Sequence, residues 1–81
     1  MQLGTHTHYK GKQYEILGVA HHTETNEKMV VYRALYDCPD LTEEYGTRPL
    51  FVRPYTEFTE LVEVAGKNVF RFTYAGESTV T

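Results

Sequence analysis

A histidine, a carboxylate and a hydroxyl stand close together in the stretch HHTET, where one apolar run ends and another begins. The residues able to do chemistry there are His22, Glu24 and Thr25, and Arg53 lies further along the chain. Arginine offers a planar fork of donors that matches a carboxylate or a phosphate, and a histidine can donate or accept a hydrogen bond. Together with Tyr32 of the intervening strand, these residues predict a binding site for a small polar or anionic ligand.

The same residues also have a purely structural interpretation. Thr25 and Glu24 are residue types that close a hairpin loop through bonds from their side chains to the backbone. In this interpretation Arg53 forms an ordinary ion pair with Glu24 or with a residue of the acidic segment, residues 37–48. The positions of the hairpin and of the Arg53 strand in the folded protein decide between the two interpretations.

Metal and cofactor chemistry receives little support from the sequence. The four histidines fall in two pairs on different elements, and neither Cys-x-x-Cys nor His-x-x-x-His spacing occurs. The only cysteine, Cys38, precedes a proline in an acidic segment, where neighbouring carboxylates disfavour a reactive thiolate. We therefore expect no metal, no cofactor and no catalytic nucleophile.

Composition limits the class of protein further. The chain has 81 residues, of which 41% are hydrophobic, so a single globular domain over residues 1–81 is expected. Its 11 acidic and 8 basic residues give a net charge of −3, which argues against a general nucleic-acid binder. A local patch of basic and aromatic side chains remains an alternative, and its members are Lys10, Lys12, Arg33, Arg53, Arg71, Tyr9, Tyr14 and Tyr32.

The expected location is the cytoplasm. A lone cysteine allows no internal disulfide, which is typical of proteins in a reducing compartment. The first residues lack the apolar segment of a secretory signal, and no apolar run approaches the length that spans a membrane.

The pattern of apolar residues predicts an all-β fold. Turn-bounded runs rich in β-branched and aromatic residues predict five short strands, at residues 14–20, 28–36, 50–53, 61–64 and 68–74. Tyr55 and Phe58 predict one helical or 3₁₀ turn before the fourth strand. A small SH3-like barrel is the expected architecture, and an open five-stranded roll is the alternative.

Several local features are predicted as well. Gly18 marks a β-bulge in the first strand, and Asn26 supplies the left-handed residue of the first hairpin loop. Like charges in the acidic segment, residues 37–48, predict an extended and solvated loop. The two ends, residues 1–7 and 75–81, are expected to be flexible.

These stretches, taken in order, resemble a small bacterial family known as domain of unknown function 1653. The resemblance covers residues 8–73 and departs from the family pattern in the longer acidic loop. It implies no activity, since the family has none assigned. The positions that carry it are His8, Tyr9, Lys10, Gly11, Tyr14, His22, Glu24, Thr25, Val30, Val31, Tyr32, Val52, Arg53, Pro54 and Phe58.

The function expected from the sequence is that of a small, non-catalytic binding module. Its partner is a small polar or anionic ligand or another protein. The alternatives are a protein-interaction barrel, with an exposed aromatic groove, and a binder of single-stranded nucleic acid, with an affinity that falls steeply with salt.

Overall fold

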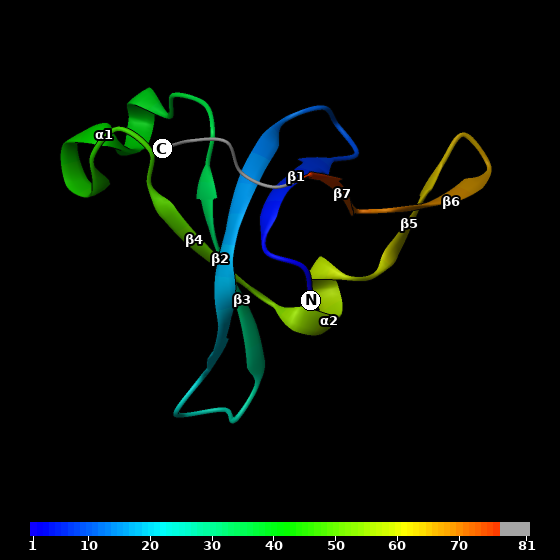
Figure 1. The fold of residues 1–81 in the computed structure, drawn as a ribbon, viewed down its shortest axis with the longest axis horizontal. Coiled ribbons are helices and arrows are strands. Elements are labelled where there is room, and N and C mark those ends of the chain that lie inside the picture. Colours follow the sequence, from blue (N-terminus) through cyan, green and yellow to red (C-terminus); the bar gives the residue numbers. More distant parts are fainter. Residues whose placement is uncertain (77–81) are drawn as a thin grey trace.

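A five-stranded antiparallel sheet and a separate two-stranded hairpin form most of the structure, a computed structural model that describes residues 1–76 (Figure 1). The elements are β1 (Gly4–His8), β2 (Gln13–His21), β3 (Lys28–Ala34), α1 (Pro39–Tyr45), β4 (Leu50–Pro54), α2 (Tyr55–Phe58), β5 (Leu61–Val64), β6 (Lys67–Phe70) and β7 (Phe72–Gly76). The mostly-β prediction is confirmed, although residues 1–76 contain seven strands where the sequence predicted five.

The large sheet is open. Its strand order is β4-β3-β2-β1-β7, and the strands at its two ends, β4 and β7, do not pair with each other within residues 1–76. The predicted closure into an SH3-like barrel is therefore not confirmed. The small sheet is the hairpin β5–β6, which projects from the large sheet on the side away from α1 (Figure 1).

The hairpin of β2 and β3 forms as the sequence predicts. The register shifts between Ile16 and Gly18, so the expected bulge is present and bends β2. Asn26 in the connecting loop has a φ of 63°, the left-handed conformation that asparagine tolerates better than other non-glycine residues.

The core lies against one face of the large sheet and is built largely from aromatic rings. Phe58 of α2 stacks on Phe72 of β7, with ring centroids 4.0 Å apart and planes inclined by 4°. Ile16, Val30 and Tyr32 complete the buried cluster. The predicted helical turn is confirmed, and its purpose is to bring Phe58 into this core.

The prediction that residues 1–7 form a flexible end is wrong for residues 4–7, which belong to strand β1. Its sequence GTHTH alternates threonine with histidine and has no apolar side chain, so it lacks the usual signal of a half-buried strand. It lies between β2 and β7 in the sheet and pairs with both, which satisfies its backbone on both edges. His6 is buried and takes the place of an apolar core residue.

The stretch NVFRFTY does not form the single predicted strand. It is interrupted at Arg71, so Phe70 belongs to β6 in the small sheet and Phe72 to β7 in the large one. The Arg71 backbone explains the break, because its N–H donates to Glu60 O (3.1 Å) and its carbonyl accepts from Tyr9 N (2.9 Å). These bonds leave the two strands in different sheets.

The acidic segment contains helix α1 and is not the extended loop predicted from its charges. Proline at the start of the helix has no N–H to leave unsatisfied, and the Thr42 hydroxyl donates to Cys38 O (3.1 Å). Gly46, with a φ of 85°, ends the helix and donates its N–H to Thr42 O (2.9 Å). The helix therefore forms despite the repulsion between the carboxylates. Cys38 is half-buried and free at the N-terminus of this helix, a position that the sequence did not indicate.

Two further expectations concern the chain ends and the membrane. The predicted flexible end at residues 75–81 lies mostly outside the described residues, and β7 runs to Gly76. Neither helix within residues 1–76 has the length and apolar character needed to cross a bilayer.

Candidate functional site

The hairpin tip binds its own backbone. His22 Nδ1 accepts hydrogen bonds from the N–H groups of Glu24 (3.2 Å) and Thr25 (3.3 Å). The Thr25 hydroxyl accepts from the N–H of Glu27 (3.3 Å), while the Glu24 carboxylate is exposed. Two of the three predicted tip residues are therefore engaged in closing the loop.

Tyr32 and Arg53 meet on the core face of the sheet. Strand β4 pairs with β3 so that Arg53 lies opposite Val30 and Phe51 opposite Tyr32, which places all four side chains on one face. Arg53 Nε donates a hydrogen bond to the Tyr32 hydroxyl (3.3 Å). The guanidinium carbon also lies 5.7 Å from the ring centroid of Phe72, within the range of a cation–π contact.

The five predicted site residues thus form two groups. No hydrogen bond or ion pair within residues 1–76 joins the hairpin tip to Arg53. The ion pair found there joins Arg71 to Glu60, and not Arg53 to Glu24 or to the acidic segment. Arg53 consequently keeps its two terminal nitrogens without a carboxylate partner among the described residues.

Charge and burial around Arg53 differ from those of an ordinary surface arginine. The hydrogen bond to Tyr32 raises the pKa of Arg53, partial burial opposes this, and the nearby Glu57 adds to the increase.

Near Arg53, the hydroxyls of Tyr14 and Tyr36 lie 2.6 Å apart. Burial and this hydrogen bond raise the pKa of Tyr14 well above its usual value, so the Tyr14 phenol is a neutral hydrogen-bonding group.

Two histidines outside the predicted site, His6 and His8, are also on this face. His6 packs edge-on against Phe58, with centroids 5.9 Å apart, and burial lowers its pKa. His8 packs against Phe72 at 5.0 Å, and its Nδ1 accepts the N–H of Lys10 (3.1 Å). The signal that places them here is their spacing of two, which puts both on one face of a strand.

The pKa of His8 is lowered first by burial and then by positive charges. The cations responsible are Arg53, Arg71 and Lys10. A neutral imidazole whose Nδ1 accepts a hydrogen bond carries its hydrogen on Nε2, so His8 is a donor at this position. Within residues 1–76, no three side chains of histidine, cysteine, aspartate or glutamate are grouped so that they could hold a metal ion.

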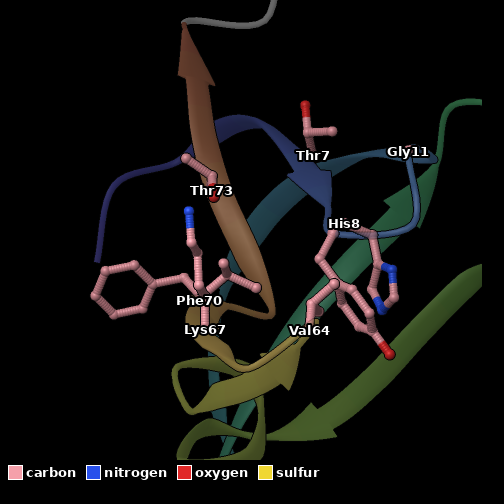
Figure 2. A pocket seen from close by; sticks show the side chains of 9 residues that line it. Thr7, His8, Gly11, Val64, Lys67, Phe70 and Thr73 are labelled. Carbon is pink, nitrogen blue, oxygen red and sulfur yellow. The ribbon is translucent and has the colours of Figure 1, made fainter.

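A cavity of about 530 Å³ lies between the β5–β6 hairpin and strands β1 and β7 (Figure 2). Figure 2 shows Thr7 and Thr73 at one end of this cavity and Lys67, Phe70 and Val64 on the hairpin side. The sequence carried no sign of it, since its walls come from segments far apart in the chain. Its lining residues are Thr7, His8, Tyr9, Gly11, Val64, Lys67, Val69, Phe70 and Thr73.

Comparison with known proteins places the chain in a family. Residues 4–74 match the family described as "Protein of unknown function (DUF1653)". The crystal structure of a protein of that family from Bordetella bronchiseptica is similar, with a TM-score of 0.81, 33% identity, and coverage of 100% of this chain and 95% of the other. No curated protein matches this chain. The resemblance read from the motifs is thus confirmed, and the chain belongs to the DUF1653 family of proteins of unknown function.

Proposed function

We propose that this protein is a non-catalytic binding module for a small polar or anionic ligand, anchored by the free side of the Arg53 guanidinium. The observation that carries the proposal is the way Arg53 is held. Tyr32 fixes one edge of the guanidinium, Phe72 lies beneath it, and the described residues place no carboxylate on the remaining nitrogens. A fork held in this way is preorganised for a carboxylate or a phosphate.

The surrounding charge supports an anionic ligand. Arg53, Arg71 and Lys10 are each close enough to His8 to lower its pKa, so positive charge is concentrated around this residue although the whole chain is acidic. Glu57 reduces this potential without forming an ion pair with Arg53. In the proposal Tyr32 and Arg53 contact the ligand, whereas His22 and Thr25 close the loop of the neighbouring hairpin and the Glu24 carboxylate remains exposed.

The test is a titration followed by NMR of labelled protein, with inorganic phosphate, acetate and adenosine monophosphate as probes. Shifts centred on Arg53 Nε and the Tyr32 ring are expected. Replacing Arg53→Gln should weaken binding about tenfold or more, since hydrogen bonds to charged groups contribute roughly 1.5–3 kcal/mol. Arg53→Lys should retain part of the affinity because it keeps the charge but loses the fork.

Arg48→Gln is the matched control, because Arg48 is an exposed arginine outside the sheet. Equal losses in the Arg53 and Arg48 variants would reduce the effect to net charge and contradict the site. Absence of any shift with all three probes would contradict it too. A steep salt dependence with short single-stranded RNA, and none with the small anions, would replace it by nucleic-acid binding.

A protein partner is the second candidate. Leu50 and Val52 are 53% and 62% exposed on the outer face of β4, an end strand of the sheet. Exposed apolar side chains on an unpaired edge are typical of a strand that another chain can join. Sedimentation velocity of wild type and Val52→Lys tests this, and concentration-dependent association lost in the variant would support it.

We place either activity in the cytoplasm, in keeping with the single cysteine.

A further inference from the structure

We infer that the cavity between the β5–β6 hairpin and strands β1 and β7 is a second binding site, for an organic anion with an apolar or aromatic body. Its volume of about 530 Å³ lies within the range of small-molecule sites. This inference does not depend on the proposed role of Arg53, which does not line the cavity.

The apolar part of the cavity explains the body of the ligand. Val64 and Phe70 line it from the hairpin and are 41% and 59% exposed, although both are large apolar side chains. Val69, on the same face of the hairpin as Val64, also lines it and is half-buried. A ligand with an aromatic or branched apolar group removes this surface from water, which is favourable in proportion to the area covered.

The polar part of the cavity explains the charge of the ligand. Lys67, Thr7 and Thr73 line it, together with His8. Since Nδ1 of His8 already accepts the Lys10 N–H, the neutral ring has only a donor left to offer. No acidic residue lines the cavity, although acidic residues outnumber basic ones by 11 to 8 in the chain. Donors and a cation without a carboxylate favour an acceptor-rich, negatively charged group.

Lys67 is placed to hold that group. It pairs with Val64 across the turn of the hairpin, so its backbone is fixed by the ladder, and it has no ion-pair partner among residues 1–76. Figure 2 shows its side chain between Phe70 and Val64, directed along the cavity towards Thr73. An anionic group bound there is close to the cation while its apolar body covers the hairpin wall.

The hairpin itself supplies an independent readout. It is a separate two-stranded sheet, attached at its base by Arg71, whose Nε donates to Glu57 O (3.2 Å) and whose N–H donates to Glu60 O (3.1 Å). An isolated two-stranded hairpin is only marginally stable in water. A ligand that bridges it to β1 and β7 must therefore slow hydrogen exchange of its amides.

The experiment compares phenylacetate with its neutral counterpart phenylacetamide, using NMR shifts and amide hydrogen exchange of the full chain. Phenylacetate is expected to shift Thr7, Lys67 and Thr73 and to slow exchange in β5 and β6. Phenylacetamide is expected to bind about tenfold more weakly, because the charge-assisted bond to Lys67 is lost. Equal binding of the two compounds, or no slowing of exchange, would overturn the inference.

Substitutions place the site and separate it from the proposed one. Lys67→Gln and Phe70→Ala should each weaken phenylacetate binding, while Lys28→Gln, which removes a lysine over the Tyr55 ring, should not. Arg53→Gln should weaken phosphate binding about tenfold or more and leave phenylacetate binding unchanged. If Arg53→Gln abolishes phenylacetate binding and Lys67→Gln does not, the cavity site fails and the Arg53 site stands. If phosphate never binds but Lys67→Gln weakens phenylacetate binding, the opposite holds.

Discussion

Two phenylalanines separated by a single residue behave in opposite ways in this protein. Phe72 is 7% exposed and stacks on Phe58 in the core, whereas Phe70 is 59% exposed on the wall of the cavity. Both belong to a stretch whose alternation predicts one face of one strand. The interruption at Arg71 assigns the second half to a sheet that supports a core and the first half to a hairpin that lies mostly in solvent.

The comparison shows how one small chain builds a stable region and an adaptable one. Each inner strand of the large sheet is hydrogen-bonded on both edges, and its core face is covered by aromatic rings and by α2. The hairpin, in contrast, has a single ladder of hydrogen bonds between β5 and β6. Val62 and Val69 are half-buried, and the other residues of these two strands are exposed. Binding surfaces are expected in the second kind of region, since local opening there costs little free energy.

The largest expected effect tests the contrast directly. Phe72→Ala should lower the free energy of unfolding by about 3–5 kcal/mol, because it leaves a cavity beside Phe58. Phe70→Ala should change it by no more than about 0.5 kcal/mol, as is usual for an exposed position. Urea unfolding followed by circular dichroism gives both values. Similar losses in the two variants would mean that the hairpin packs on the core in solution.

A smaller effect is expected at the base of the hairpin. Arg71→Ala removes the bond to Glu57 O and the ion pair with Glu60, of which the pair alone is worth about 0–1 kcal/mol because it is exposed. We expect a loss of about 1–2 kcal/mol in total. Hydrogen exchange should accelerate in β5 and β6 more than in β2 and β3. Uniform acceleration would show that Arg71 stabilises the whole domain and not the hairpin.

The hairpin turn offers a gain of stability. Ala65 has a φ of 51° and Gly66 a φ of 79°, the pair of left-handed residues found in a tight hairpin turn. Ala65→Asn should stabilise the protein by about 0.5–1 kcal/mol, since asparagine adopts this conformation at lower cost than alanine. The matched substitution Ala75→Asn, in strand β7, should not stabilise it. Thermal unfolding measures both, and no gain at Ala65 would place the hairpin outside the cooperative unit.

The smallest effect at neutral pH concerns the histidines of β1. Burial lowers the pKa of His6 from its ordinary value of 6.5, so the unfolded chain takes up its proton at a higher pH than the folded one. Stability is therefore complete above that value and decreases as the pH falls through it towards the lowered pKa. His8 adds to the decrease in the same direction.

His6→Phe keeps an apolar ring and removes the proton-binding group. Urea unfolding between about pH 7.5 and 5.5, above the range in which carboxylates titrate, should show a shallower loss for the variant than for wild type. If the free energy of unfolding fell equally steeply with pH in the variant and in wild type, His6 would have the same pKa in the folded and the unfolded chain.

Features that depend on neighbours in the chain were predictable. The β2–β3 hairpin, the bulge at Gly18, the left-handed Asn26 and the helical turn that carries Phe58 all follow from turn chemistry and a local apolar pattern. Tyr32 and Arg53 were named together among the site residues, and they do meet. His22 and Thr25 were named with them, and the structure engages both in closing their own loop.

What the sequence determined by itself, then, is the class of fold, the order of most strands and the family, because these are written in side-chain periodicity and short motifs. Only the tertiary structure decided that His6 is a core residue, that Arg71 divides a strand, and that the sheet stays open at β4 and β7. The cavity of about 530 Å³ also arises only in the tertiary structure. Each of these depends on contacts between distant segments, and such pairing energies leave no local signal in the chain.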